Sequence, residues 1–205
     1  MEKLTDHFPT LTESQQARFE AMEELYRTWN VRINVISRKD MDNLRTHHIL
    51  HSLAIAKVID FPAGSTVLDV GTGGGFPGIP LAVLFPEVRF TLCDSIGKKV
   101  KVAGAVAEGL GLENVTCVQA RAESLPGRFD YVVSRAVTDL ATFYPWVKDK
   151  FNHAIFYLKG GDLEAEIADC ARRCRLDPAK FFQVQISNWF GEEWFEGKKI
   201  VIISK

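Results

Sequence analysis

The chain has 205 residues, of which 46% are hydrophobic and 25% charged, and its formal net charge at pH 7 is −1. This composition is typical of one globular domain and excludes a disordered, collagen-like or low-complexity chain. No apolar run reaches the roughly 18 residues of a membrane span, and the polar start (MEKLTDHF) is unlike a signal peptide. The four cysteines form no CxxC pair. We therefore expect a reduced, cytoplasmic protein rather than a disulfide scaffold or a zinc ribbon.

Residues 1–62 predict a helical extension. Thr12 and Gln15 have the spacing of a capping box at a helix start. The aromatic and apolar residues that follow at helical spacing are Phe19, Met22, Tyr26 and Trp29. A second helix is expected over 40–59, before Phe-Pro-Ala-Gly at 61–64 ends the extension. Its predicted buried side is formed by Ile49, Leu53 and Ala56. We expect Trp29 to anchor the extension on the rest of the fold.

Charge is unevenly distributed along this extension. Residues 1–26 contain two Lys or Arg and six Asp or Glu, whereas residues 27–57 contain six Lys or Arg, two Asp and three His. Such a basic run is either a solvated face or a surface that contacts phosphates, and both interpretations stay open.

From residue 65 onward, apolar strand patterns alternate with helical ones. The expected strands are 66–70, 89–94, 115–120, 129–134, 154–159, 182–187 and 199–204. The expected helices are 77–85, 96–109, 138–148 and 162–175. Strands largely alternate with helices, and the last two strands are joined without one, so residues 63–205 predict a Rossmann-like, doubly wound sheet. It should have seven mostly parallel strands and an antiparallel last strand.

The stretch LDVGTGGGFPGIPLA at 68–82 carries the main functional signal. A strand that ends in glycines and opens into a helix presents backbone N–H groups to a ligand. Gly73, Gly75 and Gly78 fit G-x-G-x-x-G, the dinucleotide fingerprint, but the first glycine after the strand is Gly71.

Two further features favour S-adenosylmethionine over a dinucleotide. Asp69, Gly71 and Gly73 fit the acidic-x-G-x-G form of class I S-adenosylmethionine sites. Asp94, at the end of the second predicted strand, is placed to bind ribose hydroxyls. The same position also suits a carboxylate that caps the next helix, so both roles stay open.

The end of the fourth predicted strand limits which kinds of methyl acceptor the site could serve. It reads Ser-Arg-Ala-Val at 134–137, without the polar-Pro-Pro-aromatic motif of many amino methyltransferases acting on nucleic acid. Cys93 and Cys117 lie within predicted strands and are interpreted as buried apolar residues rather than nucleophiles. An acceptor that already has a free lone pair, such as guanine N7, needs no general base.

Together these motifs resemble the bacterial glucose-inhibited division protein B group, the 16S rRNA guanine-N7 methyltransferases that modify the 530 loop. The likeness covers nearly the whole chain. The matching segments are Trp29-Asn30 with Asn34, His48-Ile49-Leu50 with Ser52-Leu53, 69–82, Asp94-Ser95 with Gly97-Lys98, Arg121-Ala122-Glu123, Ser134-Arg135-Ala136 and Leu158-Lys159-Gly160.

The resemblance implies a class I methyltransferase that uses S-adenosyl-L-methionine to methylate N7 of a guanine in the 530 loop. It implies a partner, 16S rRNA or the small ribosomal subunit or its precursor, and we expect a monomer without a metal. The alternatives are a methyltransferase for another RNA or a small molecule, and a non-catalytic S-adenosylmethionine-binding protein.

Candidate site residues combine the motif reasoning with the resemblance. The cofactor-binding candidates are Asp69, Gly71, Gly73, Phe76, Asp94, Ala122, Glu123 and Arg135. The candidates for activity are Asn34, His48, Arg121 and Arg135. The RNA-binding candidates are Arg32, Arg38, Lys39, Arg45, Lys159 and Lys199. Arg135 is expected to hold a carboxylate, phosphate or hydroxyl and to align the reactants, the alternative being an ion pair with Asp139.

The chain departs from the family pattern at two places. Where the family usually has Arg-His and Ile-x-Asp-Ser, this chain has His47-His48 and Ile-Leu-His-Ser at 49–52. His47 and His51 share a helix face, but no third ligand is evident, so phosphate contact or solvation is favoured over a metal. The C-terminal basic position, often Arg, is Lys198 or Lys199. The other tryptophans, interpreted as packing residues, are Trp146, Trp189 and Trp194.

Overall fold

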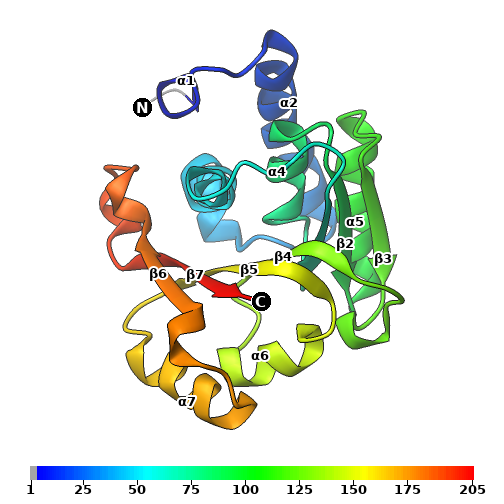
Figure 1. The fold of residues 1–205 in the computed structure, drawn as a ribbon. Helices are drawn as coiled ribbons and strands as arrows, with labels where there is room; N and C mark the ends of the chain where they lie inside the picture. The colour runs from blue at the N-terminus through cyan, green and yellow to red at the C-terminus, as the bar shows by residue number, and fades with distance from the viewer. Residues whose placement is uncertain (1–3) are drawn as a thin grey trace.

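The computed structural model describes residues 4–205 and is built around one seven-stranded sheet (Figure 1). Its strands are β1 Thr66–Val70, β2 Arg89–Asp94, β3 Val115–Gln119, β4 Phe129–Arg135, β5 Phe151–Gly160, β6 Phe181–Gln185 and β7 Lys198–Ser204. Their order is β3-β2-β1-β4-β5-β7-β6. Six strands run in the same direction, and β7, between β5 and β6, runs in the opposite one. The predicted doubly wound sheet with an antiparallel last strand is therefore confirmed.

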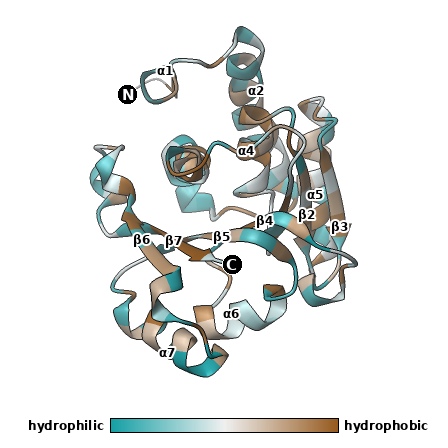
Figure 2. Cartoon of the chain, viewed as in Figure 1, coloured by the Kyte–Doolittle hydropathy of each residue, from teal (hydrophilic) through white to brown (hydrophobic). Residues whose placement is uncertain are grey.

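Helices cover both faces of this sheet. Helices α4 (Gly78–Leu84) and α5 (Gly97–Gly109) pack in one hydrophobic cluster, and α6 (Leu140–Val147) and α7 (Glu164–Cys174) pack in a second. Figure 1 shows α6 and α7 on one side of the sheet and α4 on the other. Figure 2 shows α4 and β7 as largely hydrophobic, as expected for elements packed between other layers.

The helical extension packs on the α4 face. It contains α1 (Leu4–His7) and α2 (Glu13–Arg32), and α2 begins at the predicted capping box of Thr12 and Gln15. The Gln15 side chain also donates to the carbonyls of Val83 and Leu84, which would otherwise lack partners at the end of α4. Of the predicted apolar side, Phe19, Met22 and Tyr26 are buried and Trp29 is partly buried.

The single second helix predicted over 40–59 is wrong in type. The chain instead forms a 3-10 turn at Arg38–Asn43, a π-helix at Leu44–Leu50, a short α3 at His51–Leu53 and a 3-10 turn at Ala54–Lys57. Two carbonyls in this stretch also accept side-chain donors. Ser52 Oγ donates to the His48 carbonyl at 2.6 Å, and Arg135 donates to the His47 carbonyl at 3.1 Å. Within residues 4–205, no helix is long and apolar enough to cross a membrane.

Candidate functional site

A cavity of about 460 Å³ lies at the carboxyl ends of the parallel strands, and we call it the strand-end cavity. The strand order reverses between β1 and β4, and ligands of open α/β sheets bind at such switch points. Its volume falls in the range of small-molecule sites, roughly 300–1,000 Å³. Lining residues at or after the strand ends include Val70, Gly71, Cys93, Asp94, Ala120 and Arg135.

Most of the predicted cofactor residues line this cavity. They are Gly71, Gly73, Phe76, Asp94, Ala122, Glu123 and Arg135. Arg121 also lines it, with a side chain 76% exposed and 4.0 Å from Glu123. Asp69, Asn34 and His48 do not line it.

Sequence reasoning missed several lining residues. Ala120 lies one residue after β3 and Val137 two residues after β4, so the strand boundaries themselves could have indicated them. Val35 comes from the extension and Trp146 from α6, and neither carries a local signal. Trp146 packs against the α6–α7 cluster, as interpreted, and part of its surface also faces the cavity.

The glycine loop is tied to the end of β2. Gly71, at φ +68°, donates its N–H to the Cys93 carbonyl at 2.8 Å, and Gly73, at φ +58°, donates to Asp94 Oδ2 at 2.9 Å. Both backbone conformations belong to the left-handed region that favours glycine. A Cβ at Gly73 would meet no atom within 4 Å, so this loop presents bare backbone to open space.

Asp94 ties the glycine loop to the turn that precedes α5. Its Oδ1 accepts the N–H of Ile96 at 2.8 Å in the turn before α5, while Oδ2 accepts the N–H of Gly73. A carboxylate has about four acceptor positions, so further lone pairs remain for a ligand hydroxyl. The N-cap of α5 is Ile96, without a side-chain cap hydrogen bond, so the predicted capping role of Asp94 is wrong, and the ribose contact stays a prediction.

Asp69 lies beneath the glycine loop rather than in the cavity wall. Its side chain is fully buried, and Oδ2 accepts from Thr72 Oγ1 at 2.6 Å and from Gly78 N at 2.8 Å. Within residues 4–205, its Oδ1 has no hydrogen-bond partner. Burial raises the pKa of the Asp69 carboxyl to about 7. Asp69 therefore braces the loop, and this placement argues against direct contact with a ligand in the cavity.

This raised pKa predicts how stability varies with pH. Between about pH 4 and pH 7 the unfolded chain ionises Asp69, whose ordinary pKa is 3.8, while the folded chain keeps it protonated. Unfolding then releases a proton, so stability falls as pH rises, by up to about 4 kcal/mol. Asp69→Asn keeps the accepting oxygen but cannot titrate. Urea unfolding should show the wild type losing stability relative to this variant across that window, and a pH-independent difference would contradict the assignment.

Arg135 connects the strand-end cavity to the extension. Its guanidinium donates through Nη1 to the His47 carbonyl at 3.1 Å and through Nη2 to His48 Nδ1 at 3.0 Å. It also lies 5.0 Å from the centre of the Phe76 ring, within cation–π range. Burial lowers the pKa of Arg135 to about 10, which leaves it charged at neutral pH. The alternative ion pair with Asp139 is wrong, because Asp139 instead caps α6 through the N–H of Thr142.

His48 is held as a neutral ring. An arginine can only donate, so Nδ1 must carry a lone pair and the ring proton sits on Nε2. Nε2 lies 2.7 Å from Asp40 Oδ2. Burial, together with the nearby charge of Arg135, lowers the pKa of His48 to about 4.

The remaining predicted polar residues fall in different places. Asn34 is exposed and precedes Val35, which lines the cavity. Asn30 is buried and fixes this segment, since its Oδ1 accepts the N–H groups of Val35 and Ile36. Tyr26 on α2 donates to the Gly74 carbonyl at 2.7 Å, so the extension also holds the glycine loop.

The RNA-binding candidates divide into free and paired cations. Arg32, Arg38 and Lys39 are exposed. Arg45 pairs with Glu23 at 2.5 Å. Lys159 has a side chain only 11% exposed that bonds Glu166 at 2.5 Å, which argues against the predicted contact with RNA. Lys199 lies 3.3 Å from Gln183 Oε1.

The two histidines that depart from the family pattern have structural partners. His47 Nδ1 lies 2.5 Å from Asp40 Oδ1, and its ring stacks on Trp194 with centroids 4.1 Å apart. His51 is buried edge-on to Trp194, and burial holds its pKa well below the usual range. Among residues 4–205, no group of three or more His, Cys, Asp or Glu is arranged to hold a metal ion.

Cys93 lines the cavity, but its surroundings keep the sulfur protonated rather than activate it as a nucleophile. Its Sγ donates to the Ala120 carbonyl at 3.0 Å, and burial raises its pKa to about 11. Burial likewise raises the pKa of Cys117 to about 11. Nucleophilic attack requires the thiolate, so neither sulfur is activated.

Solved structures share this fold. A SAM-dependent methyltransferase from Aquifex aeolicus is 16% identical, with a TM-score of 0.57 over 82% of this chain and 98% of that chain. The magnesium protoporphyrin IX methyltransferase of Synechocystis, solved with bound SAM, is 14% identical, with a TM-score of 0.59 over 96% of this chain and 99% of that chain. The predicted class I methyltransferase fold is therefore confirmed.

Sequence comparisons are more specific. A family model described as rRNA small subunit methyltransferase G matches residues 15–189. The ribosomal RNA small subunit methyltransferase G of Flavobacterium psychrophilum is 54% identical over 98% of this chain and 96% of that protein. The protein of the same name from Bacteroides thetaiotaomicron is 50% identical over 98% of both chains. The chain belongs to the rRNA small subunit methyltransferase G family.

Proposed function

We propose that this chain transfers the methyl group of S-adenosylmethionine to N7 of a guanine in the 530 loop of 16S rRNA. One observation carries the proposal. At the switch point of the sheet, the backbone of Gly73 faces open space and is hydrogen-bonded to Asp94, in a chain of this family. The substrate is the rRNA itself or the small ribosomal subunit or its precursor, and the enzyme acts as a cytoplasmic monomer.

The strand-end cavity fits this cofactor. Open space beside Gly73 admits a ligand against the backbone, where a side chain would intrude. Asp94 has acceptor positions left for ribose hydroxyls. Ala122 and Glu123 supply an apolar and a polar wall at another part of the cavity, suited to the adenine end.

The reaction needs alignment more than proton removal. S-adenosylmethionine supplies an electrophilic methyl group, and guanine N7 brings a lone pair exposed at the base edge. His48 is unsuited as a general base because Arg135 occupies Nδ1 and Asp40 lies at Nε2. Holding reactants in line can lower such a barrier by roughly 7–11 kcal/mol. The residues of this chain therefore act by binding and orienting.

The direct test is methyl transfer from a tritiated donor to small-subunit rRNA, with the product mapped by nucleotide. We expect one methylated guanine in the 530 loop. In parallel, S-adenosylmethionine at about 100 times its Kd should stabilise the protein by about 2.7 kcal/mol, whereas NAD should not. Asp94→Ala should weaken this stabilisation. Stabilisation by NAD alone, or methylation of another RNA, would overturn the proposal.

The exposed cations of the extension predict how RNA binds. If Arg32, Arg38 and Lys39 contact phosphates, changing all three to Gln should weaken RNA binding and flatten its dependence on salt. Each lost contact should reduce the slope of log K against log salt by about 0.7–0.9. Filter binding at several salt concentrations measures this slope, and the affinity for S-adenosylmethionine should not change.

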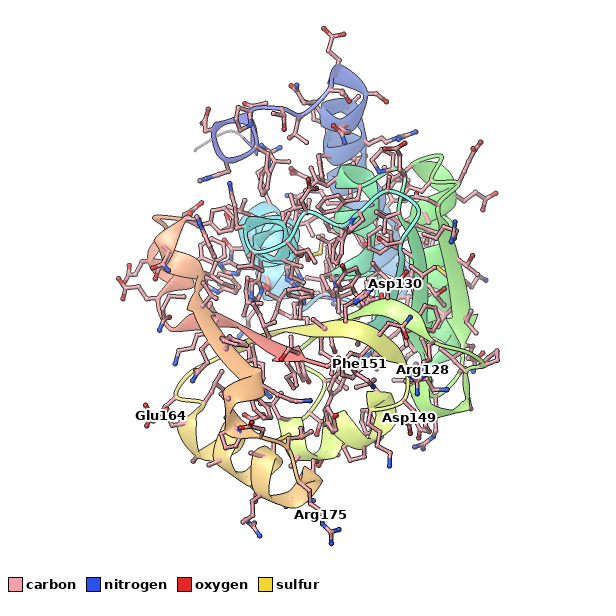
Figure 3. The ribbon with its side chains drawn as sticks, viewed as in Figure 1. Arg128, Asp130, Asp149, Phe151, Glu164 and Arg175 are labelled. Carbon is pink, nitrogen blue, oxygen red and sulfur yellow. The ribbon has the colours of Figure 1, made fainter. Side chains whose placement is uncertain are left out.

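A matched control lies on α7. The triple Gln variant of Arg172, Arg173 and Arg175 removes the same charge from the opposite side of the sheet, where Figure 3 labels Arg175. We expect this control to leave the salt slope as in the wild type. If the two triple variants change the salt slope equally, the basic run of the extension is a solvated surface and does not contact RNA specifically.

A further inference from the structure

Asp40 lies behind the residues that hold Arg135 and does not itself line the strand-end cavity. Its two carboxylate oxygens are each directed to one histidine, Oδ1 to His47 at 2.5 Å and Oδ2 to His48 at 2.7 Å. Its side chain is 31% exposed, whereas those of the two histidines are 16% and 13% exposed. The carboxylate therefore sits at the outer end of a chain of contacts that ends at Arg135.

The direction of each hydrogen bond in this series of contacts follows from which groups can donate and which can accept. The guanidinium has only donors, so His48 Nδ1 must accept. A neutral imidazole that accepts at Nδ1 carries its proton at Nε2, and a carboxylate can only accept that proton. Along the series Asp40, His48 and Arg135, each donor thus faces an acceptor.

The opposite tautomer would set an N–H of His48 against an N–H of Arg135. Such a donor–donor contact leaves two buried groups unpaired and pushes the guanidinium away. A carboxylate at Nε2 selects against this state because it cannot donate a hydrogen bond when ionised. Burial by itself raises the pKa of Asp40, but the bonds from His48 and His47 outweigh it and lower the pKa below 3.8. Asp40 is therefore ionised at neutral pH.

We propose that Asp40 is a positioning residue for methyl transfer, whose carboxylate fixes the tautomer of His48 and thereby holds the Arg135 guanidinium at the wall of the strand-end cavity. The proposal rests on the proposed function for its effect on rate, but its structural content can be tested without cofactor or RNA. It also assigns His48 a positioning role, since the ring does not line the cavity itself and contacts two residues that do, Arg135 and Phe76.

The test compares three variants. Asp40→Ala removes the acceptor, and we expect the single-turnover rate at saturating cofactor and RNA to fall about 10–100-fold, as when partners that orient metal-bound histidines are removed. Asp40→Asn keeps an amide oxygen for His48 Nε2 and should recover most of this loss. The control is Asp42→Ala, which removes a neighbouring carboxylate that is 93% exposed and 3.6 Å from Arg27. This control should keep the wild-type rate.

The second readout is the protonation pattern of His48, measured by nitrogen-15 NMR of labelled histidine in the free protein. We expect the proton on Nε2 in the wild type, in Asp40→Asn and in Asp42→Ala, and a mixture of tautomers in Asp40→Ala. A proton on Nδ1 in the wild type would overturn the proposal, even if Asp40→Ala fails to fold. So would wild-type transfer rates in a folded Asp40→Ala.

The two readouts separate this proposal from the proposed function. If the wild-type protein methylates no guanine but shows the Nε2 tautomer, and Asp40→Ala loses it, the methylation assignment fails and the positioning of Arg135 stands. If methylation proceeds and the Asp40→Ala variant matches the Asp42→Ala control in rate and tautomer, the positioning role fails alone.

Discussion

Arg135→Ala should lower the rate of methyl transfer by about 100-fold or more, the effect of misplacing reactants by about 1 Å. The substitution removes the contacts to the His47 carbonyl and His48 Nδ1, and the cation that lies over Phe76. It also enlarges the cavity that Arg135 lines. Single-turnover transfer at saturating cofactor and RNA measures the loss, and circular dichroism shows whether the variant is folded.

The Arg135→Lys variant tests whether the charge of Arg135 or the geometry of its guanidinium matters. A lysine has one ammonium, which cannot reach two acceptors in the geometry of the planar guanidinium. We expect it to recover the charge over Phe76 but only one of the two contacts with the extension, and hence part of the rate. A lysine variant as active as the wild type would show that charge alone matters. The link to the extension would then have no part in catalysis.

Local patterns are sufficient to predict most of the fold and half of the site. The capping box at Thr12 and the strand ending at Gly71 depend on residues a few positions apart, so their outcome could be predicted. The same holds for Asp94, because the carboxyl end of β2 lies beside that of β1 in a parallel sheet. Gly71 and Asp94 accordingly line the cavity as expected.

Contacts between distant segments are not predictable in this way. Arg135 and His48 are 87 positions apart, and nothing near Arg135 signals an imidazole as its partner. Its nearest acidic candidate is Asp139, one helical turn on, yet that carboxylate caps α6 instead. Lys159 resembles a solvent-facing cation in sequence, but Glu166 on α7 neutralises it across the sheet edge. The π-helix at Leu44–Leu50 also includes such a distant contact, because Arg135 donates to its His47 carbonyl.

Gly71→Ala should lower both the stability of the protein and its affinity for the cofactor. At φ +68° an alanine costs about 1–2 kcal/mol in backbone strain. Its Cβ would also lie 2.3 Å from Val137 Cγ2, and overpacking of this kind costs about 1–3 kcal/mol. Val137 cannot retreat freely, because its N–H donates to the Tyr157 hydroxyl at 3.0 Å. We expect urea unfolding to show a loss of about 2–5 kcal/mol.

The collision also displaces the cavity wall, because Val137 and Gly71 both line it. Calorimetry should therefore show S-adenosylmethionine binding at least about tenfold weaker, a loss of about 1.4 kcal/mol. Gly64→Ala is the matched control, since Gly64 has φ +82° but a Cβ at this position would meet no atom within 4 Å. It should lose only the strain energy and keep its affinity for the cofactor. If the two variants lose equal stability and both bind normally, Val137 yields to the new methyl group, and the close approach of loop and strand end is not needed for binding.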